Sequence, residues 1–202
     1  ICLSVLANAQ VTLTAIQDGD WTDPATWDTG EIPTAADDVI IAGGFTVYIN
    51  TTDATCGSLR AGLGDGSGSG YFTFAGTSSL TVIDAVVFGD VEGATGTITM
   101  DAGAAFTCGS VVEEDPGFSG IYETNLGTIV FTGTFTLPYN LFQFNNLVID
   151  GGTVTTGGRN LPIEGDLSIL SGGTLDLAEN TANRNTISGT FTVSNGSTLR
   201  IG

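Results

Sequence analysis

The chain contains no histidine and no lysine, and its only basic residues are four arginines at positions 60, 159, 184 and 200. This inventory excludes Ser-His-Asp and Cys-His nucleophile systems, imidazole metal sites and lysine bases. The four arginines are outnumbered by 22 acidic residues, which gives a net charge of −18. Because nucleic acid and anionic lipid would repel such a chain, we expect neither nucleic-acid binding nor membrane insertion.

Long apolar runs are also missing after the first nine residues, so no later stretch is predicted to span a bilayer. Residues 1–9 (ICLSVLANA) have the form of the end of a signal peptide with an A-x-A cleavage site. We expect cleavage after Ala9, which leaves Gln10 first and makes the protein secreted, either extracellular or on the cell surface. A short N-terminal strand that pairs with residues 11–14 is the alternative interpretation.

Five segments share one pattern, in which two apolar residues two apart are followed, eight positions after the first, by another such pair. Glycine and small polar residues lie between the pairs, which is typical of strand, turn, strand. The five segments are residues 39–49, 72–82, 98–108, 167–177 and 191–201. A third short strand is predicted after several of them, at residues 58–61, 85–88, 110–112 and 146–149.

Three strands per repeat predict an all-β fold, a right-handed parallel β-helix whose coils have about 20–27 residues. The best internal register joins Cys56, Val82 and Cys108, which are equally spaced along the sequence. We assign residues 39–202 to this β-helix, with six or seven coils stacked about 4.8 Å apart. Residues 126–150 depart from the pattern, which indicates an extruded loop or a changed coil shape. A β-sandwich built as a meander is the rival fold, because it also alternates short strands with glycine turns.

Cysteine is scarce, and Cys2 belongs to the predicted signal peptide. Two coils separate Cys56 from Cys108, so their Cα atoms should lie about 9 to 10 Å apart, beyond the reach of a disulfide. We therefore expect two free, buried thiols.

Both tryptophans lie in residues 10–38, and we interpret this segment as a cap that covers the open end of the β-helix. It resembles the mature N-termini of glycine-rich β-helical surface and adhesin proteins of Bacteroidota. The matching residues are Gly19, Trp21, Trp27, Gly30, Pro33, Asp38 and Ile40, although Val39 follows Asp38 without the usual intervening residue. Members of that group are long exported proteins with a C-terminal sorting domain. Since residues 197–202 still follow the coil pattern, we expect a longer natural protein.

Carboxylates are the only general acids and bases that the sequence offers. Paired carboxylates of a glycoside hydrolase would have to come from Asp84, Asp90, Glu92, Glu113, Glu114 and Asp115, beside aromatic residues such as Tyr122, Tyr139 and Phe142. We interpret these acids as solvated turn residues and predict no catalytic and no cofactor-binding residues. Calcium is the one candidate ion, with Asp18, Asp20, Asp23 and Asp28 as its candidate ligands.

The sequence thus favours a non-catalytic structural or adhesive module of a surface or filament protein. Its expected partners are cell-surface or glycan ligands, or further copies joined through the ends of the β-helix. A carbohydrate-active enzyme and a self-assembling fibre subunit are the alternatives. Threonine rows such as Thr153, Thr155 and Thr156 show no common register across coils in the sequence, so ice binding is not expected.

Overall fold

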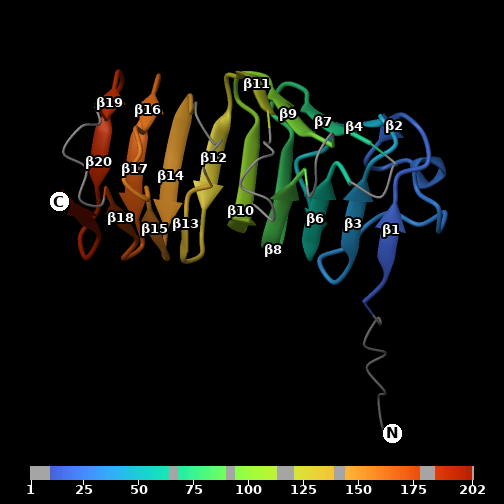
Figure 1. The fold of residues 1–202 in the computed structure, drawn as a ribbon, viewed down its shortest axis with the longest axis horizontal. Helices are drawn as coiled ribbons and strands as arrows, with labels where there is room; N and C mark the ends of the chain where they lie inside the picture. Colours follow the sequence, from blue (N-terminus) through green and yellow to red (C-terminus); the bar gives the residue numbers. More distant parts are fainter. Residues whose placement is uncertain are drawn as a thin grey trace, which may run out of the picture.

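The computed structural model describes residues 10–63, 68–89, 94–112, 121–138, 144–177 and 185–201, and only the backbone of residues 121–125. Within these ranges the chain is all β, apart from one short 3-10 turn, η1 (Pro24–Thr26). Every pairing between two named strands is parallel, and the strands follow one another along the long axis of the molecule (Figure 1). The predicted parallel β-helix is therefore confirmed, and the rival β-sandwich is excluded.

Most coils contribute a strand to each of three faces, which the chain visits in a fixed order. The first face holds β5 (Ala54–Cys56), residues 79–82 of β8 (Ser79–Phe88), residues 105–108 of β10 (Ala105–Val112), β12 (Thr128–Phe131), β14 (Asn146–Asp150), β17 (Leu167–Leu170) and β20 (Phe191–Val193). β8 and β10 run on through a corner, so their later residues pair on the second face.

In the N-terminal coils, the second face holds β1 (Thr12–Thr14), β3 (Asp38–Ile41), β6 (Ser58–Ala61) and the later parts of β8 and β10. In the later coils, a separate sheet occupies the same position, with β13 (Phe135–Thr136), β15 (Thr153–Thr155), β18 (Thr174–Asp176) and β21 (Thr198–Arg200). The third face holds β2 (Gly19–Asp20), β4 (Thr46–Ile49), β7 (Gly70–Phe74), β9 (Gly96–Met100) and β11 (Ile121–Asn125), followed by β16 (Pro162–Ile163) and β19 (Thr186–Ile187).

Alternation of apolar and polar residues along each strand points one set of side chains inward, where identical positions of successive coils form columns. One column contains Cys56, Val82 and Cys108, which pair directly in register. All three side chains are buried, and both thiols are free. The predicted register and the predicted free thiols are thus confirmed. Aromatic rings add to this core, with Phe106 lying 5.6 Å from Phe72 between ring centroids.

The sequence suggested that the common eight-residue pattern marks the same corner in every coil, but the five segments span different corners. Residues 39–49 turn from the second face to the third, and residues 72–82 and 98–108 turn from the third to the first. Residues 167–177 and 191–201 turn from the first face to the second. The offset is the same because each unit is a short strand, a tight turn and a short strand, whichever corner it spans. For the same reason residues 146–149 lie on the first face rather than beside residues 58–61.

The coils shorten after β11, in the region where the sequence departs from the pattern. Ile129 and its partner Leu147 in the next coil are closer in the sequence than Leu80 and its partner Phe106. In the described part of these coils, the third face consists of an isolated bridge between Phe144 and Ile163. The predicted change of coil shape is therefore present. Residues 139–143 lie outside the described part of the chain.

The N-terminal segment 10–38 is wound in register with the coils that follow, since β1 pairs with β3 and β2 pairs with β4. Residues 26–28 then fold back along the outer edge of β1. There the amide of Ile16 donates to Thr26 O, and the amide of Asp28 donates to Thr14 O, both at 2.9 Å. The C-terminal end of β1 is hydrogen-bonded on both edges in this way. This part of a sheet edge, which would otherwise invite pairing with another chain, is thus covered.

The two tryptophans fill this first coil, each with only 1% of its surface exposed. Their rings meet edge to face with centroids 5.3 Å apart, and Trp27 Nε1 donates to the backbone oxygen of Trp21 at 3.1 Å. Edge-to-face geometry is favoured for aromatic pairs, and a buried indole N–H needs an acceptor.

Candidate functional site

Two tyrosines stand on the outer surface of the third face, on neighbouring strands. Tyr48 of β4 is 43% exposed and Tyr71 of β7 is 37% exposed, while Val47, Ile49, Phe72 and Phe74 beside them in the chain are fully buried. Tyr48 pairs with Thr73, and Tyr71 pairs with Thr46, so the two tyrosines are diagonal neighbours on the sheet. Diagonal neighbours lie about 7–8 Å apart, within reach of aromatic side chains.

The surroundings of the two tyrosines are rich in hydroxyl groups. Thr46, Thr73 and Thr99 are partly exposed on the same surface, and Asp20 pairs with Tyr48 on its other side. We name Tyr48, Tyr71, Thr46, Thr73 and Thr99 the tyrosine face. Aromatic rings offer apolar area to a ligand, and hydroxyls both donate and accept hydrogen bonds. A sheet surface of this composition is chemically suited to an uncharged, hydroxyl-rich molecule such as a neutral sugar chain.

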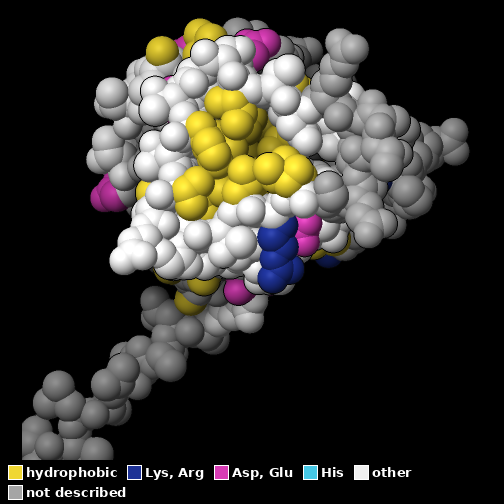
Figure 2. Space-filling model, turned by 90° about the vertical axis from the view of Figure 1, so that its left-hand side faces the viewer, with side chains coloured by type: hydrophobic (Ala, Val, Ile, Leu, Met, Phe, Trp, Pro, Cys, Tyr) yellow, Lys and Arg dark blue, Asp and Glu magenta, His cyan; other side chains and the backbone are white. Residues whose placement is uncertain are grey.

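A second unusual surface is the C-terminal end of the β-helix, which Figure 2 views directly. Hydrophobic side chains gather in the middle of this end, and charged side chains lie only toward its margin. Phe191, Val193 and Ile201 are 43%, 41% and 76% exposed, whereas Leu167 and Ile169, one coil earlier, are 1% and 0% exposed. The columns that end in Phe191 and Val193 are buried in every earlier coil, and they are open to solvent in the last one.

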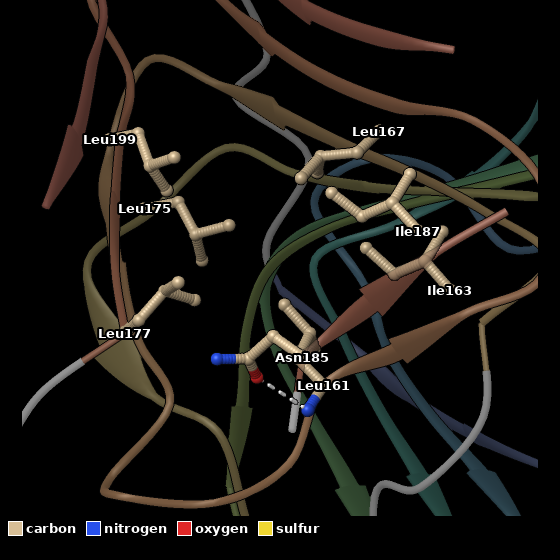
Figure 3. A pocket seen from close by; sticks show the side chains of 8 residues that line it. All are labelled: Leu161, Ile163, Leu167, Leu175, Leu177, Asn185, Ile187 and Leu199. Carbon is tan, nitrogen blue, oxygen red and sulfur yellow. Dashed lines mark hydrogen bonds between the residues drawn. The ribbon is translucent and has the colours of Figure 1, made fainter. Parts of the chain in front are cut away.

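The centre of this end is a small hollow with a cavity volume of about 30 Å³. Its lining side chains point toward one another across the gap (Figure 3). They are Leu161, Ile163, Leu167, Leu175, Leu177, Asn185, Ile187 and Leu199. Asn185 is the only polar member, and its Oδ1 accepts a hydrogen bond of 2.9 Å from the amide of Leu161. Because this polar group already has a partner, the hollow is chemically an apolar one.

Three of the four predicted calcium ligands accept hydrogen bonds from backbone amides through their carboxylates, and the four do not gather round one point. Asp18 accepts from the amide of Thr46 at 2.7 Å, Asp23 from the amide of Ala25 at 2.9 Å, and Asp28 from the amide of Thr14 at 2.9 Å. Asp20 accepts from Thr26 Oγ1 through its backbone oxygen. Within the described residues, no three acidic, cysteine or histidine side chains lie close enough together to hold a metal ion.

Most of the candidate catalytic acids, namely Asp90, Glu92, Glu113, Glu114 and Asp115, lie outside the described residues. The exception is Asp84, which sits exposed at the corner inside β8, where its amide donates to Gly57 O at 2.8 Å. Tyr139 and Phe142 also lie outside the described part. The backbone of Tyr122 is described, and it pairs with the buried Ile98. Within its described part, the structure therefore brings none of these residues together into a carboxylate pair.

Among the described residues, the two thiols of Cys56 and Cys108 have pKa values above that of a free thiol. Complete burial raises the pKa of the Cys108 thiol. Burial also raises the pKa of the Cys56 thiol, and the nearby carboxylates of Asp38 and Asp37 raise it further. Only the thiolate is a good nucleophile, so both cysteines are inert core residues.

Hydroxyl rows run along the outside of the β-helix, contrary to the expectation from the sequence. Thr153, Thr174 and Thr198 pair in register on the second face. The neighbouring column is broken by charge, because Thr155 is followed by Asp176 and Arg200. These rows were missed because the coils have unequal lengths, so residues that stack are not equally spaced in the sequence.

The sequence analysis also missed the tyrosine face, although the alternation of residues around Tyr48 and Tyr71 is a usable signal for outward side chains.

Among the described residues, no helix is long and apolar enough to cross a membrane. Comparison of the chain with protein-family models, with curated proteins and with solved structures gives no match.

Proposed function

We propose that the chain is a non-catalytic structural and adhesive module of an extracellular surface protein. The observation that carries the proposal is the unbroken parallel ladder, which extends on the first face from β5 to β20. In such a stack each coil is held by its neighbours through backbone hydrogen bonds and a shared apolar core. The product is a stiff rod that can hold a binding surface away from a cell.

The adhesive surface in this proposal is the tyrosine face, and its ligand is a neutral glycan. Burying Tyr48 and Tyr71 against the apolar faces of sugar rings removes exposed aromatic area from water. The threonine hydroxyls beside them can exchange hydrogen bonds with sugar hydroxyls. A net charge of −18 disfavours acidic polysaccharides, since no arginine belongs to the tyrosine face.

The test is binding of the purified chain to soluble neutral polysaccharides, namely a dextran, a β-glucan and a mannan, with polygalacturonate as the acidic counterpart. We expect at least one neutral polysaccharide to bind and polygalacturonate not to bind. The double variant Tyr48→Ala/Tyr71→Ala should weaken that binding by about tenfold or more, since an aromatic contact is worth about 0.5–1.5 kcal/mol. Ile83→Ala is the matched control, because Ile83 is 51% exposed but lies away from the tyrosine face.

Two outcomes would count against this function. Unchanged glycan binding in the tyrosine double variant would show that the tyrosine face is not the adhesive surface. Release of reducing sugar from any of the polysaccharides would favour the carbohydrate-active enzyme instead, and loss of that release in Glu113→Gln or Glu114→Gln would identify its acids.

Export and kinship with Bacteroidota surface proteins remain part of the proposal. They are supported by the A-x-A sequence at Ala7–Ala9 and by the Trp21 to Pro33 motif. Residues 1–9 lie outside the described part of the chain. N-terminal sequencing of the protein recovered from its native culture medium or cell surface should begin at Gln10, and a chain that keeps residues 1–9 would contradict export by cleavage.

A further inference from the structure

The two tyrosines of the tyrosine face lie on a diagonal line that continues across the third face. They are diagonal neighbours on adjacent coils, because Tyr71 pairs with Thr46, two residues before Tyr48. One further step in the same direction leads from Tyr71 to Thr95, which lies two residues before Thr97, the partner of Tyr71 on β9. The line therefore extends beyond the residues that define the tyrosine face.

At both ends this line reaches a pair of uncharged polar side chains. One step back from Tyr48, on the coil of β2, lies Thr22, whose Oγ1 donates to Asn50 Oδ1 at 3.4 Å. At the other end, Thr95 Oγ1 and Ser69 Oγ share a hydrogen bond of 2.8 Å. Thr22 and Asn50 are exposed, and Ser69 and Thr95 are partly exposed. We name this line the diagonal track, which consists of Thr22, Tyr48, Tyr71 and Thr95.

Other directions across the third face offer less to a ligand. Along the rod, Tyr71 is followed by Thr97, which is only 5% exposed. Tyr48 is followed by Thr73, which supplies a hydroxyl but no second ring. Toward the N-terminal coil, Tyr48 leads to the carboxylate of Asp20. The diagonal track is the direction that contacts both rings and contains no charged side chain.

Two stacking positions on a rigid sheet favour a stiff ligand. Neighbouring positions of the track are about 7–8 Å apart, more than the length of one hexose unit, so one sugar ring cannot cover both tyrosines. A chain that is already extended loses less conformational freedom on binding than a flexible chain does. β-1,4-Linked hexoses form such an extended chain, and their flat ring faces suit tyrosine, which contributes contact area at a low entropic cost. The three steps of the track, about 21–24 Å in total, accommodate about four to five units.

We propose that the tyrosine face binds an extended β-1,4-linked glycan that crosses the rod obliquely along the diagonal track. Inner sugar units stack on Tyr48 and Tyr71, and outer units exchange hydrogen bonds with the polar pairs at the two ends of the track. This inference rests on the proposed glycan-binding function. It adds the linkage, the direction and the end contacts of the ligand.

The first test is calorimetric titration of the purified chain with cello-oligosaccharides of one to six units. Isomalto-oligosaccharides, which have flexible α-1,6 linkages, are the counterparts of equal length. Affinity for the cello series should rise about tenfold between two and four units as the end contacts are added, and should level off at about four to five units. Isomalto-oligosaccharides should bind about threefold more weakly or worse, since more freedom is lost on binding.

The second test moves one ring without removing it. Thr46→Tyr/Tyr48→Thr places the two rings directly opposite each other, with Cβ atoms about 4.5–5.5 Å apart. This exchange keeps the composition of the face but breaks the track, so cellotetraose binding should fall as far as in Tyr48→Ala/Tyr71→Ala. Asn50→Ala removes an end contact and should weaken cellotetraose binding about threefold to fivefold while leaving cellobiose binding unchanged. Thr107→Ala, on the outer surface of the first face, is the matched control and should bind cellotetraose like the wild-type chain.

The outcomes separate this inference from the function on which it rests. A wild-type chain that binds no oligosaccharide and no polysaccharide would overturn both. Binding that needs the two tyrosines, but is equal for glucose and cellotetraose, equal for the two linkages or retained in the exchange variant, would overturn the diagonal track alone. Urea unfolding checks that the exchange variant is folded, and if it is not, the length series and Asn50→Ala decide.

Discussion

The corner between β14 and β15 contains two adjacent glycines that test how closely the coils are stacked. Gly151 has a φ of +103°, and a Cβ added to it would find room, with its nearest neighbour, Thr132 O, 3.7 Å away. Gly152 has no such φ, but its Cβ would overlap the carbonyl group of Gly133 in the preceding coil and lie 2.8 Å from the Cα of Gly133. Gly151→Ala therefore probes backbone conformation, whereas Gly152→Ala probes the space between coils.

The magnitudes of the two effects differ. A left-handed conformation costs a residue with a Cβ about 1–2 kcal/mol, which is the loss of unfolding free energy expected for Gly151→Ala. Gly152→Ala overpacks the corner against backbone that cannot rotate away, at about 1–3 kcal/mol. It also forces the coils apart where the amide of Gly152 donates to Thr132 O and the amide of Thr174 donates to Gly152 O. Two such bonds are worth about 1 kcal/mol each, so the expected total is about 3–5 kcal/mol.

Urea unfolding followed by circular dichroism measures both variants against the wild-type chain. The expected order of stability is wild type, then Gly151→Ala with a loss of about 1–2 kcal/mol, then Gly152→Ala with a loss of about 3–5 kcal/mol. Equal losses, or a Gly152→Ala variant that is the more stable of the two, would refute the close contact between the Gly133 and Gly152 corners.

Two further predictions concern the core. Because burial raises the pKa of Cys56 and Cys108, their stabilising effect is complete below the unfolded thiol pKa of about 8.5 and is lost as pH rises above it, at about 1.4 kcal/mol per pH unit for each thiol. Unfolding measured between about pH 8 and about pH 10 should show this slope, and a Cys56→Val/Cys108→Val variant should lack it; a slope that persists in that variant would assign it to other groups. Phe106→Ala removes a fully buried ring and should lower the free energy of unfolding by about 3–5 kcal/mol. Phe191→Ala removes a ring that is 43% exposed and should lower it by about 1 kcal/mol. Similar losses in the two unfolding curves would contradict the difference in burial.

The sequence predicted the features that depend on local alternation and on equal spacing. Cys56, Val82 and Cys108 are equally spaced along the chain, and that spacing is the length of the coils that contain them. Their stacking and their free thiols followed directly. Alternation alone also placed Phe72 and Phe74 inside, because period two fixes which side of a strand faces the core.

The sequence could not predict features that depend on which residues of neighbouring coils stack on each other. The corners have similar lengths and similar glycine-rich composition, so residues 39–49 and 167–177 look alike although they turn between different faces. Longer and shorter coils occur in one stack, and no constant period relates Thr153 to Thr174 and Thr198.

For the two candidate surfaces, too, local alternation was predictable from the sequence, whereas the contacts between strands were not. That Tyr48 and Tyr71 point outward follows from alternation, but their position as diagonal neighbours needs the register of β4 and β7. That the last coil is apolar can be read from residues 191–201. That part of the outer edge of β1 is covered could be learned only from the hydrogen bonds that residues 26–28 make to it.

In-register stacking of the coils is tested most directly by cross-linking along one outer column. Thr55, Thr81 and Thr107 pair successively on the first face. Neighbours in this column lie about 4.8 Å apart, inside the Cα range of about 4.4–6.8 Å for a disulfide, and residues two coils apart lie about 10 Å from each other, outside it. In a Cys56→Val/Cys108→Val background, mass spectrometry should find a disulfide in Thr81→Cys/Thr107→Cys and none in Thr55→Cys/Thr107→Cys. A disulfide in the second variant, or its absence from the first, would contradict the stacked coils.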